Sequence, residues 1–279
     1  MTTELSESDA ARFRAYERKR HDALAPTYDS FFTPVTRRAH APLLDAAQLR
    51  AGARLLDVAT GGGALPADAQ ARGATAVGVD LSDAMVGVAA SHHPGIDFRQ
   101  TDVEQLPFPD EIFDAVVCNF GVGHFPRPER GVAECTRVLK PGGRLAFSWW
   151  EDSSKMRIRG LFREASADVG AKPPPDVPDG YSPLRFADTS AFRELLEGAG
   201  LKGVTVQDHD ATHRIPDIET LWRGGLGSFA VAASAIAHQD QPTQEKIRAA
   251  LERRAQEYVT ADGLVLPVAF KIAAGEKER

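Results

Sequence analysis

Three consecutive glycines, Gly61 to Gly63, follow a short apolar segment and constrain this chain more than any other feature of its sequence. The segment 55–58 has the branched apolar residues of a buried strand, interrupted by Asp57. Glycine loses more conformational freedom on folding than any other residue, so such a run is expected where the backbone takes positive φ values or approaches another molecule closely. The sequence therefore predicts a buried strand that leads into a ligand-binding loop.

A glycine-rich turn between a strand and a helix is also typical of nicotinamide- and flavin-binding proteins, whose pattern is G-x-G-x-x-G. Counted from Gly61, the third glycine of that pattern falls on Pro66. Asp57 lies four residues before the first glycine, where a carboxylate would repel a pyrophosphate. The same carboxylate suits a cationic or amine-bearing ligand, so the sequence argues against a dinucleotide.

The spacing Asp57-x-Ala59-x-Gly61-x-Gly63 resembles motif I of the class I S-adenosylmethionine-dependent methyltransferases. The ligand of that family carries an amino acid and a sulfonium. Family members usually have glycine where this chain has Ala59, which leaves the loop slightly stiffer but keeps a small side chain. Within the family, the chain is most similar to the branch of ubiquinone and menaquinone biosynthesis, which includes many small-molecule enzymes.

Further strands fall where this resemblance places them, at 74–80, 96–100, 112–119 and within 137–148. Singly, each match has a structural explanation, but their order over 53–150 is improbable by chance. The resemblance implies an α/β fold, Rossmann-like and doubly wound. Its sheet would be mostly parallel and seven-stranded, with an antiparallel last strand and helical lid insertions.

The resemblance also assigns roles to single residues. Asp80 would accept hydrogen bonds from both ribose hydroxyls, Leu81 and Met85 would flank the adenine, and Asp102 with Val103 would meet the adenine edge. The predicted contacts with the cofactor, S-adenosyl-L-methionine, are Asp57, Ala59, Thr60, Gly61, Gly63, Asp80, Leu81, Met85, Asp102, Val103, Asn119 and Phe120.

Two residues are candidates for a direct part in the reaction. His124 follows the fourth strand at the cofactor end and titrates near neutrality, so it is the first choice for a general base, although a structural role for the His-Phe-Pro turn stays open. Tyr28, followed by Asp29, matches a tyrosine that in the family closes over the active site. A base is optional, because alignment of the reacting atoms alone can supply on the order of 7 to 11 kcal/mol.

The composition predicts a cytoplasmic enzyme without nucleic-acid or membrane partners. A net charge of −6 gives no basic footprint, and no apolar run approaches the roughly 20 residues of a membrane span. Residues 1–9 lack the cationic start and apolar stretch of a signal peptide. Cys118 and Cys135 are expected to be small core residues. No metal is predicted, because His209 and His213 share a strand face without a third ligand of matching spacing.

The whole chain, 1–279, is expected to form one methyltransferase domain with additions around a cofactor-binding core at 53–150. Residues 1–47 would form an N-terminal helical lid, with a helix from Ser8 to His21 that carries a solvated cationic face and a second helix at 34–47. Residues 151–192 and 214–262 would be substrate-side insertions. They are expected to contain a helix at 155–169, a proline-rich loop at 172–180, and helices at 217–237 and 243–258 with Trp222 and Phe229 as aromatic anchors.

Three functions follow from these features. The leading one is transfer of a methyl group to oxygen, nitrogen or activated carbon of a small-molecule acceptor. An enzyme of the same fold and cofactor that catalyses a cyclisation or rearrangement stays open, as does a non-catalytic regulator. The insertions suit either a substrate lid or a subunit interface, so a homodimer also stays open.

Overall fold

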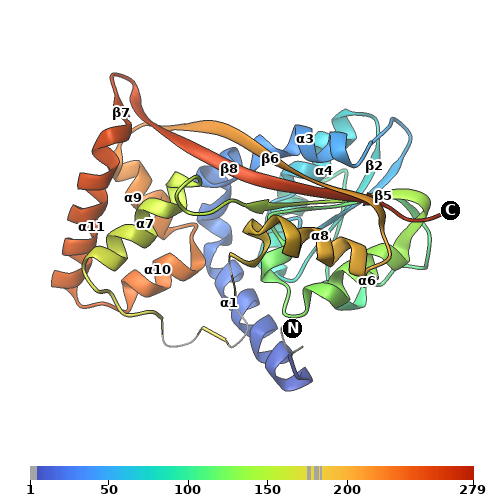
Figure 1. Cartoon of the computed structure of the whole chain (residues 1–279), viewed down its shortest axis with the longest axis horizontal. Helices are drawn as coiled ribbons and strands as arrows, with labels where there is room; N and C mark the ends of the chain where they lie inside the picture. The colour runs from blue at the N-terminus through green and yellow to red at the C-terminus, as the bar shows by residue number, and fades with distance from the viewer. Residues whose placement is uncertain (1–4, 175–176, 179–181, 183) are drawn as a thin grey trace.

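The computed structural model describes residues 5–174, 177–178, 182 and 184–279. Its centre is one sheet with the strand order β3-β2-β1-β4-β5-β8-β6 (Figure 1). The strands are β1 (Arg54–Val58), β2 (Thr75–Asp80), β3 (Asp97–Gln100), β4 (Phe113–Asn119), β5 (Leu139–Trp150), β6 (Lys202–Ile215), β7 (Val259–Thr260) and β8 (Gly263–Glu276). Strands β1 to β5 pair in parallel, whereas β8 runs antiparallel to β5, β6 and the short β7. The predicted Rossmann-like α/β fold with an antiparallel last strand is confirmed.

Helices cover both faces of this sheet, as a doubly wound fold requires. Figure 1 shows α3 and α4 on one side and α6 and α8 on the other. The helices around the core are α3 (His40–Ala46), α4 (Ala64–Ala71), α5 (Asp83–His92), α6 (Pro128–Val138) and α8 (Thr189–Gly198). Ser82 caps α5, because its side chain accepts a hydrogen bond from the Met85 backbone N–H at 3.1 Å. Cys118 and Cys135 are buried in the core as predicted.

A second group of helices lies at one end of the molecule, beyond the ends of β6 and β8 (Figure 1). They are α7 (Arg157–Asp168), α9 (Ile218–Leu226), α10 (Ala230–Ala237) and α11 (Gln241–Ala255). The Phe162 ring stacks on Trp222 and meets Phe229 edge to face, with centroids 5.9 and 5.4 Å apart. Both predicted anchors are therefore buried in an aromatic cluster that holds these helices together.

The long helix α1 (Glu7–Phe31) runs between this helical end and the sheet (Figure 1). The predicted bounds were wrong at both ends. Ser6, rather than Ser8, caps the helix by accepting a hydrogen bond from the Asp9 backbone N–H. The helix also continues through Pro26 to Phe31, because Tyr28 and Phe31 beyond the proline pack against the core.

Two other predicted helices are divided in the structure. The segment expected to be helical over 34–47 forms α2 (Thr33–Thr36), a 3-10 turn (Arg37–Ala39) and α3. The helix expected over 217–237 stops after Leu226 and restarts at Ala230. The Thr27 hydroxyl donates a hydrogen bond of 2.5 Å to the Gly227 carbonyl, so that carbonyl is satisfied from α1. The proline-rich loop at 172–180 lies partly outside the described residues, and its described part has no regular secondary structure.

Candidate functional site

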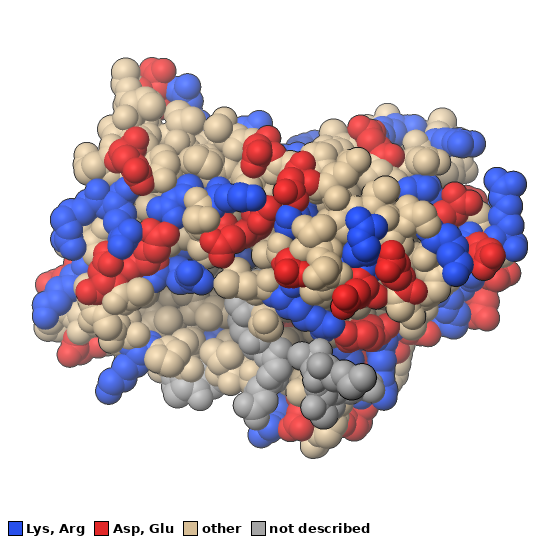
Figure 2. Space-filling model, in the orientation of Figure 1, with Lys and Arg blue, Asp and Glu red and all other residues tan. Residues whose placement is uncertain are grey.

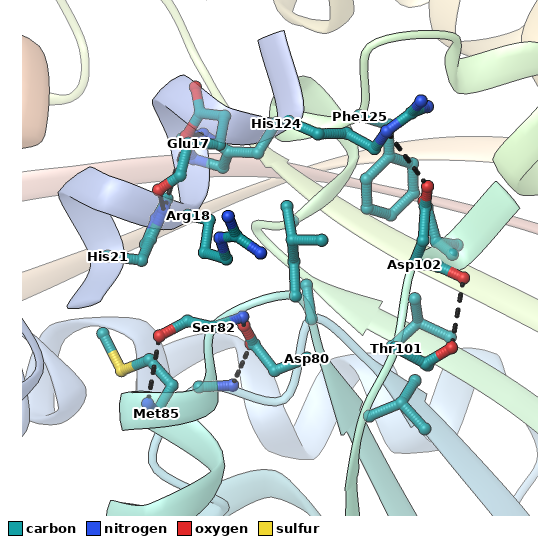
Figure 3. Close-up of a pocket in the computed structure, with 18 of the residues that line it drawn as sticks. Glu17, Arg18, His21, Asp80, Ser82, Met85, Thr101, Asp102, His124 and Phe125 are labelled. Atoms are coloured by element: carbon teal, nitrogen blue, oxygen red, sulfur yellow. Dashed lines mark hydrogen bonds and ion pairs between the residues drawn. The ribbon is translucent and has the colours of Figure 1, made fainter. Parts of the chain in front are cut away.

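A cavity of about 820 Å³, partly open to solvent, lies at the carboxyl ends of β1, β2 and β4 (Figure 3). Open α/β sheets bind ligands beyond the carboxyl ends of their strands. In Figure 3, Glu17, Arg18 and His21 project from α1 across the cavity from Asp80, Ser82 and Met85. The cavity therefore has the sheet edge as its floor and α1 as its roof.

The glycine loop has the backbone conformations that its sequence predicts. Gly61 and Gly63 have φ values of +53° and +80°, in the left-handed region that favours glycine. A Cβ atom on Gly62 would lie 3.0 Å from Asp29 Oδ1, so the loop also approaches the end of α1 closely. Ala59 is left-handed as well, with φ +57°, at the position where the family usually has glycine.

Asp57 is buried under this loop, with only 1% of its surface exposed. Its Oδ2 accepts a hydrogen bond of 2.7 Å from the Thr60 hydroxyl, whereas Oδ1 has no hydrogen-bond partner. Burial raises the pKa of Asp57 to about 8. Both residues line a second cavity of about 370 Å³ beside the first. An orphaned buried carboxylate oxygen suits a cationic donor, so the site fits the ammonium group of S-adenosylmethionine.

Asp80 stands at the end of β2 and faces the main cavity. Its Oδ2 accepts a hydrogen bond from the Gly61 backbone N–H, and its Oδ1 accepts one from the Ser82 N–H, both at 2.9 Å. These bonds fix the carboxylate between the glycine loop and α5. Each oxygen retains lone pairs that can accept further hydrogen bonds from ligand hydroxyls.

Asp102 lies in the loop after β3. Its Oδ1 accepts a hydrogen bond of 3.0 Å from the Glu104 N–H, and its Oδ2 lies 3.3 Å from Arg14 Nε on α1. The side chain of Arg14 is 19% exposed and also lies 3.6 Å from Glu104. The predicted solvated cationic face was therefore wrong for Arg14, which joins the roof of the cavity to its floor.

The structure brings most of the predicted site residues together. The main cavity is lined by eleven of them: Tyr28, Ala59, Gly61, Asp80, Leu81, Met85, Asp102, Val103, Asn119, Phe120 and His124. Asp57 and Thr60 line the neighbouring cavity, together with Tyr28, Ala59, Gly61 and Asn119. Gly63 lines neither cavity and caps the start of α4. A Cβ there would lie 2.7 Å from Phe98 Cζ, so Gly63 serves packing.

Two further predicted residues are held by the end of β5. Asn119 Oδ1 accepts a hydrogen bond of 2.7 Å from the Ser148 hydroxyl, and its Nδ2 donates to the Thr36 carbonyl. Phe120 has a φ of +59° and stacks on Trp150 with ring centroids 3.5 Å apart. This stack forms a rigid apolar wall at the cavity.

The two candidate catalytic residues differ in their environments. Burial raises the pKa of Tyr28 well above its ordinary value, so Tyr28 stays protonated and suits hydrogen bonding rather than proton removal. His124 ends a 3-10 turn (Val122–His124) after β4, and its Nδ1 lies 3.1 Å from Glu17 Oε2. The sequence reasoning missed Glu17 and His21. Their spacing of four residues, which places them on one helix face, was the available signal.

Figure 2 shows cationic and anionic side chains interspersed over the viewed face. Within the part of the chain that the structure describes, no helix is long and apolar enough to cross a membrane. His209, one of the paired strand histidines, stacks on Phe270 with ring centroids 5.3 Å apart.

Comparison with known proteins identifies the chain. Residues 56–147 match the family described as "Methyltransferase domain". A demethylmenaquinone methyltransferase of Beutenbergia cavernae is 33% identical over 169 residues, which cover 58% of this chain and 70% of the relative. One of the same name from Clavibacter sepedonicus is 38% identical over 136 residues, 48% of this chain. The matched part spans about half of that relative, 52% of its length.

The fold is also that of phosphoethanolamine N-methyltransferase 2 of Haemonchus contortus, solved with S-adenosyl-L-methionine. The TM-score is 0.53 at 17% identity, over 87% of this chain and 53% of the other. That likeness concerns the fold alone, whereas the sequence relatives carry the assignment. The chain belongs to the class I S-adenosylmethionine-dependent methyltransferases.

Proposed function

We propose that this protein transfers a methyl group from S-adenosylmethionine to a small-molecule acceptor. The observation that carries the proposal is the placement of Asp57, Asp80 and Asp102 around two cavities that share lining residues, each carboxylate at or after the end of a different strand. Three separated acceptor groups match a ligand that carries an ammonium, a ribose and an adenine amine. Family membership and the orphaned Oδ1 of Asp57 support this arrangement.

The bound cofactor supplies a methyl group that its sulfonium already activates. In the proposed arrangement, Asp57 pairs with the ammonium, Asp80 accepts from the ribose hydroxyls, and Asp102 with Val103 meets the adenine edge. Leu81 and Met85 pack against the adenine faces. Because hydrogen bonds hold the three carboxylates in place, the chain contributes mainly by orientation, which can be worth on the order of 7 to 11 kcal/mol.

We place the acceptor beneath α1, on the side of the cavity formed by Phe120, Phe125 and His124. Aromatic rings on this wall favour a flat, largely apolar acceptor. The names of the relatives are consistent with a quinone-like molecule. The reaction would be shielded from water by the roof segment 1–47 and by the insertions 151–192 and 214–262. We also propose that the insertions could form a homodimer interface.

Binding of the cofactor tests this function directly. Calorimetry on the full chain is expected to show binding of S-adenosylmethionine, weakened by roughly tenfold or more in Asp80→Asn because a charge-assisted hydrogen bond is worth about 1.5 to 3 kcal/mol. Asp262→Asn, a change at an exposed aspartate on the β7–β8 turn, serves as the matched control. Equal binding by wild type and Asp80→Asn would contradict the assignment of Asp80.

Product mass tests the reaction. A methylated acceptor and released S-adenosylhomocysteine are expected in equal amounts. A product of unchanged mass would instead favour a cofactor-assisted cyclisation or rearrangement. Absence of turnover with intact cofactor binding across oxygen, nitrogen and carbon acceptors would favour a regulator.

A further inference from the structure

A buried carboxylate and a histidine meet at the roof of the cavity, although 107 residues separate them in the sequence. Glu17 comes from α1 and His124 from the turn after β4, and both line the main cavity (Figure 3). Glu17 Oε2 lies 3.1 Å from His124 Nδ1, within hydrogen-bond distance. The side chain of Glu17 is 4% exposed and that of His124 is 27% exposed. The carboxylate is therefore enclosed, while the imidazole reaches the cavity.

Glu17 is charged in this environment. Burial alone would raise the pKa of Glu17, but the charge that His124 carries when protonated, the hydrogen bond from its ring, and the charges of His21 and Arg20 outweigh burial and lower it. A carboxylate can only accept a hydrogen bond, so His124 Nδ1 must donate it. In the neutral ring this leaves the lone pair on Nε2.

His21 is held differently. Its Nδ1 lies 2.9 Å from the Glu17 backbone carbonyl and 3.4 Å from Glu17 Oε2, so its proton is engaged by its own helix. Its ring meets that of His124 edge to face, with centroids 5.1 Å apart. The other charged groups that line the cavity are Arg14 and Arg18 on α1, Asp80 at the end of β2, and Asp102 after β3.

We propose that Glu17 is a positioning residue that holds His124 as the general base for an acceptor hydroxyl, in the cavity assigned under the proposed function. Glu17 Oε2 fixes the ring through Nδ1, and Nε2 removes the hydroxyl proton. The arrangement of a carboxylate, an imidazole and a hydroxyl follows the logic by which hydrolases activate serine.

The atoms balance in this step. The acceptor oxygen forms a bond to the methyl carbon while the methyl–sulfur bond breaks and its electron pair stays on sulfur. The hydroxyl proton moves to His124 Nε2, and the imidazolium shares its other proton with Glu17. Solvent removes the extra proton after the product leaves.

The pair of Glu17 and His124 narrows the class of acceptor to phenols and enols that are neutral in the cavity. A phenol beside Phe120 and Phe125 is poorly solvated, and burial disfavours its anion. A neutral oxygen is a weak nucleophile, so a base at its proton is worth about 10²- to 10⁴-fold in rate. An acceptor that is already ionised gains nothing from the base.

Two phenols of matched shape test the role of His124. With catechol as probe, His124→Ala is expected to lose about 10²-fold or more in kcat, and added imidazole should restore part of it. With 4-nitrocatechol, whose nitro group favours the phenolate, the loss should be less than about tenfold. His238→Ala, at an exposed histidine after α10, is the matched control. A loss of the same size on both phenols, or none on either, would overturn the role of a base.

The pH profile tests the role of Glu17. His124 must be neutral to accept a proton, so the rate with catechol rises with pH on the acidic side. Because a carboxylate stabilises a neighbouring imidazolium, Glu17→Gln is expected to move this limb to lower pH and to reduce the plateau. Glu245→Gln, on α11 and far from the cavity, should leave the profile unchanged. An unmoved limb in Glu17→Gln would overturn the positioning role.

Nitrogen NMR gives a readout that does not depend on turnover. Wild-type protein, free and with S-adenosylmethionine, is expected to show a neutral His124 protonated on Nδ1, and Glu17→Ala should mix the two tautomers. A His124 protonated on Nε2 would overturn the proposal. Catechol methylation that requires Mg²⁺ or Zn²⁺ and stops with EDTA would also overturn it, because Glu17, His21 and His124 would then be metal ligands. Cofactor binding without turnover of either phenol overturns the acceptor class alone. Failure to bind the cofactor overturns the proposed function itself.

Discussion

Ala59 adopts a left-handed backbone conformation, with φ +57°, at the start of the cofactor loop. That conformation costs an L-residue about 1 to 2 kcal/mol, which exceeds the roughly 0.5 to 1 kcal/mol of extra chain entropy that glycine loses on folding. Ala59→Gly is therefore expected to raise the free energy of unfolding by about 0.5 to 1 kcal/mol in urea denaturation. Ala67→Gly, inside α4, should lower it by a similar amount. If both variants changed the free energy of unfolding in the same direction, backbone strain at Ala59 would be contradicted.

Residues with local signals could be predicted, whereas residues defined by a tertiary contact could not. Asp57 and Asp80 stand at the ends of apolar strands, so their place at one sheet edge follows from the strand pattern and the parallel topology. Glu17 is one of eight charged residues in 7–20, half of which are exposed. Its partner His124 is fixed only when α1 crosses the sheet. The sequence spacing of Glu17 and His124 does not predict that crossing.

At the scale of elements, two adjacent glycines allow α9 to pack closely. A Cβ on Gly224 would overlap the Phe31 ring of α1, and one on Gly225 would overlap the Phe162 ring of α7. Gly224→Ala is expected to lower the free energy of unfolding by about 1 to 3 kcal/mol, because these rings cannot move without disturbing the aromatic cluster.

The same substitution in an open position gives a control of opposite sign. Gly87 lies on the exposed face of α5, and a Cβ there would meet no atom within 4 Å. Gly87→Ala should therefore raise the free energy of unfolding by about 0.5 to 1 kcal/mol. Thermal melts of both variants measure the difference, and a stabilising Gly224→Ala would show that α9 does not depend on this close approach.

The bounds of the helices were predicted less accurately than those of the strands, and α1 shows why. The first helix was predicted to end at His21, and proline usually ends or kinks a helix, yet α1 continues past Pro26. It continues because the aromatic residues beyond Pro26 pack against the core, with the Phe32 ring 5.4 Å from Trp150 at the end of β5 and 5.0 Å from Phe229 just before α10. These contacts lie more than 100 residues away in the sequence, and they override the local preference.

For the whole molecule, the positions of β1, β2 and β4 along the chain followed from the sequence because each is a largely apolar run between turn residues. The pairing of β6 with β8 along their whole length did not. Their register runs from Lys202 paired with Glu276 to Ile215 paired with Leu264, well past the edge of the core sheet. The outer part of β6 alternates exposed and half-buried residues, so few of its side chains are buried in a core. Its backbone hydrogen bonds to β8 hold it in place instead. This extension carries the helical end of the molecule.

Asp57 couples the stability of the whole fold to pH. Its pKa of about 8 in the folded chain lies above the value of about 3.9 in an unfolded chain. Between those values the folded state holds a proton that the unfolded state has released. The contribution of Asp57 to the free energy of unfolding therefore falls as pH rises from about 4 to 8 and is constant above about pH 8. Asp57→Asn should remove this fall, measured as urea denaturation at several pH values. Asp262→Asn should retain it.

The same proton links stability to cofactor binding. An ammonium group beside Oδ1 favours the ionised carboxylate, so S-adenosylmethionine should displace the Asp57 proton below about pH 8 and bind more tightly as pH rises toward that value. Calorimetry at pH 6.5 in two buffers of different ionisation enthalpy would measure the protons released, with close to one expected for wild type and fewer for Asp57→Asn. Equal proton release by the two proteins would show that the ligand ammonium does not meet Asp57, and the cofactor would then have to lie differently across the sheet edge.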